Sequence, residues 1–259
     1  MLADLFSLHG RTALVTGGSR GIGKIIAAAF LEAGARVYIS SRKADQCDAT
    51  ASELAGRSGN CVSIPQDVST TEGCRSLAAA YLKREPTLDI LVNNAGASWL
   101  AEFDEFPERG WDKVLDLNLK SPFFLTQALV QALEAAATPD KPAKVINIAS
   151  MDGIILNPVE AYSYTASKAA LIHLTRRLAA RLIERNIVVT AIAPGPFASD
   201  LNVAARDRAE TVAASTPARR IGKDEDMAGT ALYLASRAGD FVVGETIAVD
   251  GGISFASFI

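Results

Sequence analysis

The sequence has few of the residues that support disulfide, metal or hydrolase chemistry. Its 259 residues include only three cysteines and two histidines. An odd number of cysteines without a C-x-x-C pair argues against a disulfide framework and against zinc, so we expect no metal. A Ser-His-Asp hydrolase would need one of the histidines, but His9 lies in the N-terminal arm and His173 within a helical pattern.

Positive charge and long apolar runs are also lacking. The chain has 26 Lys and Arg against 29 Asp and Glu, a formal net charge of −3, whereas proteins that bind nucleic acid usually carry a basic excess. No apolar run approaches the roughly 18–20 residues of a membrane span, and the start lacks the basic and apolar regions of a signal peptide. We therefore expect a cytoplasmic protein without nucleic-acid or membrane partners.

What the sequence does contain is a regular alternation of short apolar runs and longer helical stretches. We expect strands at 12–16, 36–40, 62–64, 88–92, 144–149, 187–192 and 246–249. We expect helices at 22–33, 44–55, 71–84, 107–137, 164–185 and 224–236, with a kink near Lys120 caused by Pro122. Continuous apolar strands separated by helices indicate a parallel sheet covered on both faces.

This pattern predicts an α/β fold consisting of one Rossmann-type domain over residues 1–259. Right-handed crossovers give a doubly wound, seven-stranded parallel sheet with helices on both faces. The longest stretch without a helical or strand pattern is 194–217, and a loop of that length in a compact domain is usually a lid or disordered. We expect it to be a substrate lid.

A glycine-rich turn, T-G-G-S-R-G-I-G at 16–23, joins the first strand to the first helix. Glycines allow a tight turn and a close approach to a diphosphate, and the helix N-terminus provides free N–H groups for the anion. The alternative is a plain glycine-rich turn. The residues predicted to bind a nucleotide here are Gly17, Ser19, Arg20, Gly21, Ile22 and Gly23.

The end of the second strand indicates which dinucleotide is bound. NAD sites place an acidic residue there, but this chain has Ser41 followed by Arg42. Arg42, with Arg20, suits a 2′-phosphate, so we predict NADPH/NADP+; the alternative is a pair of solvated surface arginines. Asp67, after the third strand, is predicted to accept from the adenine amino group or to cap the next helix.

Tyr164 and Lys168 are spaced i, i+4, which places them on one helix face. At about 4 Å and an effective dielectric constant near 20, the lysine ammonium would attract the phenolate by roughly 4 kcal/mol. We therefore expect Lys168, helped by the oxidised nicotinamide, to lower the pKa of Tyr164, making it a general acid for a carbonyl oxygen. Ser150 ends the fifth strand and could polarise the same oxygen. The alternatives are a surface pair and a helix cap.

Taken together, the motifs resemble those of the short-chain dehydrogenase/reductase family over essentially the whole chain. The matching residues are Thr16 to Gly23, Asp67-Val68, Asn93 to Gly96, Asn118, Ser150, Tyr164 with Lys168, Pro194-Gly195 and Val249 to Gly252. The segment from Ser150 to Tyr164 is one residue longer than the usual spacing. Met151 stands at the usual spacing before Tyr164, but its side chain cannot polarise a carbonyl oxygen. We therefore assign the role of the catalytic serine to Ser150.

The resemblance implies roles for these residues. Asn118, Ser150, Tyr164 and Lys168 would be catalytic, with Asn118 holding a kinked helix and an ordered water that extends a proton relay through Lys168. The long helices would form a dimer or tetramer. The further residues implied to lie along the cofactor are Val68, Asn94, Ala95, Gly96, Ile192, Pro194, Gly195, Phe197 and Ser199.

The narrower resemblance is to bacterial NADPH-dependent 3-oxoacyl reductases, including the type associated with rhamnolipid synthesis. It implies reduction of a 3-oxoacyl thioester, linked to acyl carrier protein or coenzyme A. Alternatives are a reductase of a sugar, polyol or polycyclic alcohol, and a catalytically silent NADPH-binding regulator. Apolar residues predicted to line an acyl tunnel, or to pack under the lid, are Ile154, Ile155, Leu156, Phe197, Leu201 and Val203.

Four arginines near the predicted lid have two interpretations. They could meet an acidic carrier protein or a coenzyme A phosphate, or form a solvated face balanced by Asp207 and Glu210. These residues are Arg206, Arg208, Arg219 and Arg220.

Overall fold

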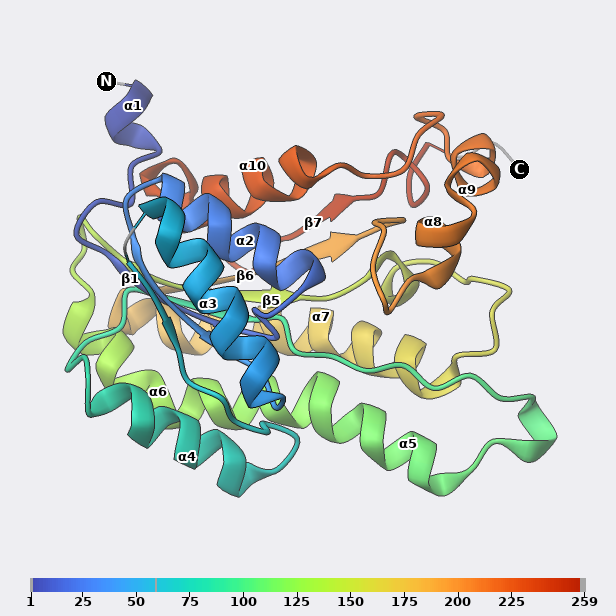
Figure 1. Ribbon diagram of the computed structural model, residues 1–259, viewed down its shortest axis with the longest axis horizontal. Helices are drawn as coiled ribbons and strands as arrows, with labels where there is room; N and C mark the ends of the chain where they lie inside the picture. The colour runs from blue at the N-terminus through green and yellow to red at the C-terminus, as the bar shows by residue number, and fades with distance from the viewer. Residues whose placement is uncertain (1, 59, 257–259) are drawn as a thin grey trace.

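The computed structural model describes residues 2–58 and 60–256, whose strands form one seven-stranded sheet (Figure 1). All neighbouring strands are parallel, in the order β3-β2-β1-β4-β5-β6-β7. The predicted doubly wound parallel sheet is confirmed. The strands are β1 (Thr12–Thr16), β2 (Arg36–Ser40), β3 (Cys61–Ser63), β4 (Ile90–Asn93), β5 (Ala143–Ile148), β6 (Ile187–Pro194) and β7 (Thr246–Val249).

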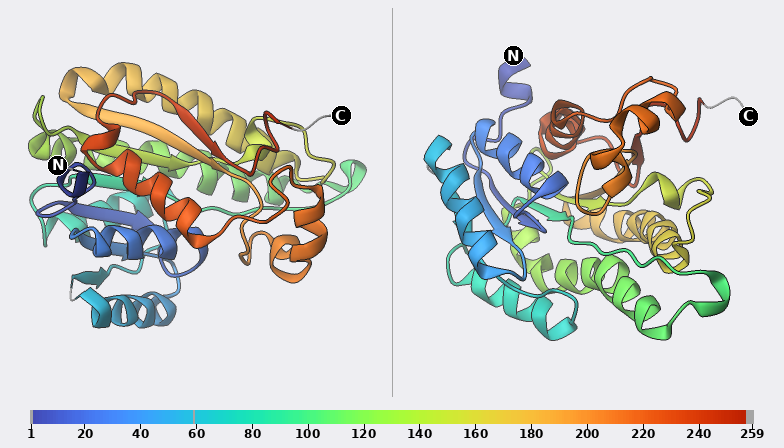
Figure 2. Two further views of the ribbon diagram at one scale, coloured as in Figure 1. Left: turned by 90° about the horizontal axis from the view of Figure 1, so that it is seen from above. Right: turned by 45° about the vertical axis from the view of Figure 1, so that its right-hand side comes forward.

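The strands read as apolar runs because both faces of the sheet are buried. In β1, Ala13 and Val15 belong to one hydrophobic core and Leu14 to the other, as expected when successive side chains of a strand alternate. Helices α2 (Gly21–Glu32), α3 (Ala44–Ser58) and α10 (Asp224–Ala235) pack on the first core (Figure 2). Helices α4 (Thr71–Leu82), α6 (Ser121–Ala136) and α7 (Tyr162–Leu182) pack on the second. Both cores stabilise the fold, because apolar surface removed from water contributes about 25 cal/mol for each Å² buried.

The predicted helices occur in the predicted order, and the described residues also contain a short helix before the first strand and two in the segment 194–217 that were not predicted. None of the helices of the described residues combines the length and apolar character needed to cross a bilayer. They are α1 (Leu2–Leu5), α2 (Gly21–Glu32), α3 (Ala44–Ser58), α4 (Thr71–Leu82), α5 (Glu108–Leu115), α6 (Ser121–Ala136), α7 (Tyr162–Leu182), α8 (Val203–Asp207), α9 (Ala209–Ser215) and α10 (Asp224–Ala235).

The long helix predicted over 107–137 is broken where the kink was expected. Helix α5 ends at Leu115, a π-helical turn covers Asp116–Lys120, and α6 begins at Ser121 with Pro122 in its first turn. Proline lacks an N–H and is tolerated in a first turn. The π-turn carries Asn118, which is buried.

The segment predicted to be irregular, 194–217, is partly helical. It contains α8 and α9, whose few residues leave too little periodicity for a sequence pattern to reveal them. Asn202 begins α8, and its side chain accepts from the Ala205 N–H. We call residues 194–217 the lid segment.

The strand order reverses between β1 and β4. The chain leaves β1 towards β2 and β3 and returns to the other side of β1 as β4. In such sheets a crevice opens at this switch point, outside the carboxyl ends of the strands. The glycine-rich turn, the segment after Asn93 and the segment after Ile148 all leave the sheet at this edge (Figure 1).

Candidate active site

The glycine-rich turn packs tightly against the segment after β4. Gly17 has φ +64°, and a Cβ there would lie 2.7 Å from Asn94 Nδ2 and 3.1 Å from Ala95 Cα. A Cβ on Gly23 would lie 2.4 Å from Gly17 O. Asn94 Nδ2 donates to Thr16 O at 2.9 Å and to Gly17 O at 3.2 Å. The turn is therefore held in one shape that only glycine allows, and the Asn94 side chain supports it.

Helix α2 begins directly after this turn and offers an anion site. Its N-cap residue, Arg20, makes no side-chain capping bond, and the first turn of the helix has no acidic residue. The leading N–H groups and the positive end of the helix dipole are therefore available to a phosphate. Ser199 of the lid segment lies close above, because a Cβ on Gly21 would be 3.6 Å from its Cβ. This cradle fits a dinucleotide diphosphate.

The end of β2 presents cations rather than a carboxylate. Arg42 is exposed and forms no ion pair within residues 2–58 and 60–256. Arg20 pairs with Asp200 of the lid segment. Ser41 is partly exposed beside them, and its hydroxyl donates weakly to Lys43 O at 3.5 Å.

Asp67 and Val68 lie at the next position along the same edge. Asp67 is exposed, and its Oδ1 accepts from the Ser69 N–H at 2.9 Å. The interpretation of Asp67 as a helix cap is wrong, because Thr70 caps α4 through Gly73 N. Val68 is buried in the second core.

Ser150 and Tyr164 lie side by side. Ser150 is buried, and its hydroxyl accepts from the Asp152 N–H at 3.2 Å to start a 3₁₀ turn over Met151–Gly153. It also forms a hydrogen bond with Tyr164, which lowers the pKa of the phenol. Ser150 therefore caps a turn and faces Tyr164 at once.

Without the cofactor, burial rather than Lys168 sets the direction of the Tyr164 pKa shift. Burial raises the pKa of Tyr164 to about 12 despite the Ser150 hydrogen bond. The Lys168 Nζ lies 5.6 Å from the Tyr164 ring centroid and donates to Ile148 O at 2.7 Å. Burial also lowers the pKa of Lys168 to about 8, against the raising effect of Asp152. Desolvation, which spacing does not reveal, has the largest effect on the pKa of both groups, and neither residue is among the causes of the other's shift.

Asn118 ties the π-turn to the segment after β4 and to α7. Its Oδ1 accepts from the Ala97 N–H at 2.8 Å, and its Nδ2 donates to Ala97 O at 2.9 Å and Ser167 Oγ at 3.1 Å. A Cβ on Gly96 would lie 3.4 Å from Asn118 Oδ1 and 3.9 Å from Lys168 Nζ. The structure thus brings Asn118 and Lys168 together around Gly96.

The predicted substrate residues divide into two groups. Leu156 is 92% exposed, and Leu201 and Val203 are also exposed. Ile154 instead packs against a small buried cluster that includes Ile172, and Ile155 is partly buried.

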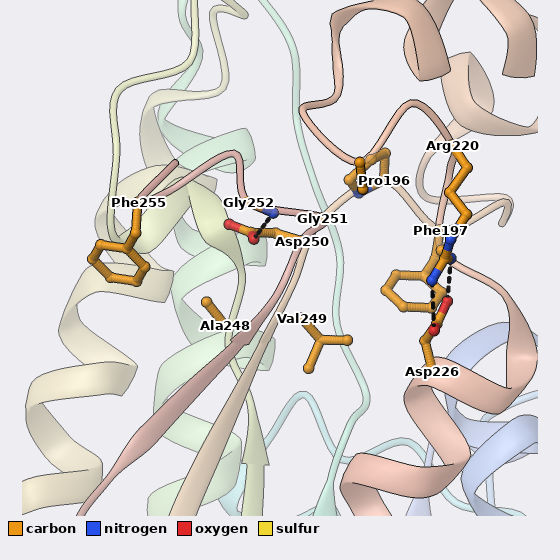
Figure 3. Close-up of a pocket in the computed structure, with 12 residues that line it drawn as sticks. Pro196, Phe197, Arg220, Asp226, Ala248, Val249, Asp250, Gly251, Gly252 and Phe255 are labelled. Atoms are coloured by element: carbon orange, nitrogen blue, oxygen red, sulfur yellow. Dashed lines mark hydrogen bonds and ion pairs between the residues drawn. The ribbon is translucent and has the colours of Figure 1, made fainter. Parts of the chain in front are cut away.

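Phe197 belongs to the packing at the root of the lid segment. It is 4% exposed and lies in the first core, and its ring is so close to Gly222 that a Cβ there would be 2.5 Å away. Gly222 N also donates to Pro196 O at 2.9 Å. Figure 3 shows Phe197 beside the Arg220–Asp226 ion pair, in a pocket of about 320 Å³. Of the two alternatives for Phe197, packing under the lid therefore describes its side chain.

Sequence reasoning missed a second group of exposed apolar residues at this edge. Phe103 is 74% exposed, and its ring lies 5.8 Å from that of Tyr162, two residues before Tyr164. The Ala101 N–H donates to Glu160 O at 3.4 Å, which joins the two loops. No periodicity marks these loops, so only the structure shows the cluster. We call the following six exposed residues the apolar rim: Leu100, Phe103, Leu156, Val159, Leu201 and Val203.

Two of the four arginines near the lid segment are already paired. Arg206 binds Asp200 and Asp207, and Arg220 binds Asp226 through both of its Nη atoms. Arg219 Nη1 donates to Ala214 O at 2.6 Å. For Arg206, the interpretation as part of a solvated face balanced by carboxylates therefore holds, although its partners are Asp200 and Asp207 rather than Glu210.

Comparisons with known proteins agree over nearly the whole chain. A family model described as enoyl-(acyl carrier protein) reductase matches residues 17–254. The rhamnolipids biosynthesis 3-oxoacyl-[acyl-carrier-protein] reductase of Pseudomonas aeruginosa is 48% identical over 250 residues, 95% of this chain and 97% of that protein. The solved P. aeruginosa RhlG/NADP active-site complex is 46% identical, with a TM-score of 0.94, covering 97% of this chain and 99% of that one.

A relative with a different named activity is also similar. The 2-dehydro-3-deoxy-D-gluconate 5-dehydrogenase of Bacillus subtilis is 40% identical over 258 residues, 97% of each chain. Similarity over nearly the whole chain therefore extends to proteins named for different substrates. With the matched family model and these identities, the chain belongs to the short-chain dehydrogenase/reductase family of oxidoreductases.

Proposed function

We propose that the chain catalyses the NADPH-dependent reduction of a 3-oxoacyl thioester to the 3-hydroxyacyl thioester. The observation that carries this proposal is the buried Ser150 next to the half-buried Tyr164 and beside Lys168, at an edge of the sheet bordered by the apolar rim. Similarity to the P. aeruginosa reductase supports the same substrate class.

The bound NADPH would supply a hydride to the keto carbon. The glycine-rich turn and the start of α2 would hold its diphosphate, and Arg20 and Arg42 its 2′-phosphate. Lys168, whose Nζ lies near Gly96, would hold the nicotinamide ribose hydroxyls. The NADP complex of the similar P. aeruginosa protein supports this choice of cofactor.

Tyr164 is suited to be the proton donor. Burial raises the pKa of Tyr164 to about 12 in the chain alone, so the phenol is protonated at neutral pH. Efficient transfer of that proton to the keto oxygen would need nearby cations that stabilise the phenolate. The Ser150 hydroxyl would donate a hydrogen bond to that oxygen as negative charge develops on it. The keto carbon gains the hydride and the oxygen gains the phenolic proton. The cationic forms of Lys168 and of the bound cofactor would stabilise the phenolate that remains.

The apolar rim favours an acyl chain over a sugar acid. A chain of methylene groups gains about 0.8 kcal/mol for each CH₂ that it buries, whereas a polyhydroxylated acid gains nothing from leucine, valine and phenylalanine. Reduction of a sugar acid is the second candidate, because the B. subtilis relative is named for such a substrate.

The cofactor assignment predicts a selective loss of NADPH. Replacing Arg42 by alanine removes a charge-assisted contact with the 2′-phosphate, so kcat/KM for NADPH should fall roughly 10-fold or more while that for NADH stays within about twofold. Arg84→Ala, which removes another exposed arginine, is the matched control. Equal losses with both cofactors would contradict the assignment.

The substrate assignment predicts an effect that depends on chain length. Phe103→Ser should lower kcat/KM for long 3-oxoacyl thioesters about 10-fold, because part of a phenyl surface no longer covers the chain. The 3-oxobutanoyl thioester should be unaffected. Phe241, which is 101% exposed in the loop before β7 at the opposite edge, provides the control substitution Phe241→Ser. Loss on both substrates alike would count against an acyl-binding rim.

The remaining expectations are part of the same proposal. The whole chain would act as one NADP-binding domain in the cytoplasm, and the lid segment would close over the bound acyl chain. The thioester would be carried by acyl carrier protein or coenzyme A. We also propose a homo-oligomer, as the family resemblance implies.

A further inference from the structure

Asp200 lies where the lid segment crosses the N-terminus of α2. Its neighbour Ser199 is the residue that approaches Gly21. Two local hydrogen bonds fix this stretch. The Asn202 N–H donates to Ser199 Oγ at 3.0 Å, and Asn202 Oδ1 accepts from the Ala205 N–H at 3.0 Å. The Asp200 carboxylate is therefore positioned beside the glycine-rich turn by bonds within the lid segment.

Two arginines bind this carboxylate. Arg20 of the glycine-rich turn pairs with Oδ2, and Arg206 of α8 pairs with Oδ1 at 2.8 Å. Arg206 also binds Asp207 at 2.7 Å. The side chains of Arg20 and Asp200 are 56% and 50% exposed, so a dissolved anion can reach the pair. An ion pair this exposed is weak and can exchange its partner.

We propose that Asp200 is a specificity-determining residue that competes with the cofactor 2′-phosphate for Arg20. The inference rests on the proposed function, which assigns Arg20 to that phosphate. The Asp200 carboxylate and the 2′-phosphate compete for the same N–H donors of Arg20. Binding of NADPH must therefore break the Arg20–Asp200 ion pair, which lowers the affinity for NADPH. NADH has no 2′-phosphate, and its binding leaves the Arg20–Asp200 pair intact.

The same exchange connects the cofactor to the lid segment. After Arg20 turns to the phosphate, Asp200 keeps its contact with Arg206, which belongs to the lid segment itself. The ion pair between the lid segment and the glycine-rich turn is then gone. By reciprocity, a change that removes this pair while leaving Arg20 in place strengthens NADPH binding.

Binding titrations of NADPH and NADH to the full chain, without thioester, test this competition. Asp200→Asn keeps the shape of the side chain and removes its charge. It should tighten NADPH binding about two- to fivefold, the range expected for one exposed ion pair, and leave NADH binding within about 1.5-fold. Asp207→Asn, which removes a carboxylate that binds Arg206 but not Arg20, should change neither. The gain should shrink in high salt, which screens exposed charges.

A second background isolates the role of Arg20. In the Arg20→Ala chain, Asp200→Asn should no longer tighten NADPH binding, because the guanidinium for which Asp200 and the 2′-phosphate compete is absent. Unchanged or weaker NADPH binding by Asp200→Asn would overturn the inference, as would a gain that persists without Arg20. A wild-type chain that fails to bind NADPH would overturn the proposed function as well, so the two failures are distinguishable.

Discussion

Replacing Tyr164 by phenylalanine should lower kcat about 1,000-fold and leave the Kd for NADPH within about twofold. The substitution keeps the ring and removes only the hydroxyl that forms the hydrogen bond with Ser150 and would protonate the keto oxygen. A positioned general acid typically contributes roughly 10²–10⁴-fold. Steady-state oxidation of NADPH with a 3-oxoacyl thioester measures kcat, and a titration without thioester measures the Kd.

The same helix offers a matched control for this substitution. The Tyr162 hydroxyl, on the first residue of α7, donates to the exposed Glu160 carboxylate at 2.7 Å. Tyr162→Phe removes a hydroxyl two residues from Tyr164 without touching Ser150 or Lys168, so its kcat should stay within about threefold of wild type. Similar turnover by Tyr164→Phe and the wild type would remove Tyr164 from the chemistry.

Replacing Gly17 by alanine should both destabilise the chain and weaken NADPH binding about 10-fold or more. A Cβ at this position would lie 2.7 Å from Asn94 Nδ2 and 3.1 Å from the Ala95 backbone. The turn must then move away from the segment after β4, and its N–H groups move away from the diphosphate. We expect the free energy of unfolding to fall by about 3 kcal/mol, the sum of the left-handed backbone penalty and the clash.

Gly10 separates these two contributions. It has φ +72°, close to the +64° of Gly17, but nothing lies within 4 Å of its Cβ position. Gly10→Ala should therefore cost only the backbone penalty, about 1 kcal/mol, and leave NADPH binding unchanged. Chemical denaturation and cofactor titration of both variants measure the two effects. Equal behaviour of Gly10→Ala and Gly17→Ala would show that the close approach to Asn94 has no role.

The fold could be predicted because it depends on patterns that are local and repeated. Apolar runs separated by helices identify parallel strands, and Pro122 identifies the break that places Asn118. The spacing of Tyr164 and Lys168 fixes their common helix face whatever the surroundings. These features need no knowledge of burial.

The site could be predicted less well where burial decides the chemistry. Burial has the largest effect on the pKa of Tyr164, and the spacing of Tyr164 and Lys168 does not reveal that burial. The apolar rim is likewise a property of exposure, because Phe103 would read as a core residue from its type alone. Phe197 is the opposite case, an apolar lid residue that packs into the core. The Arg20–Asp200 pair joins residues 180 positions apart and has no sequence signal.

The most direct measurement is the oxidation of NADPH by the purified full chain with a long-chain 3-oxoacyl thioester, alongside a keto sugar acid and with NADH as the second cofactor. The protein should consume NADPH when the thioester is added, more slowly use NADH, and leave the sugar acid almost untouched. Consumption of NADPH only with the sugar acid, or with neither compound, would contradict this account. Tyr164 could then not be the residue that protonates the keto oxygen of a 3-oxoacyl thioester bound at the apolar rim.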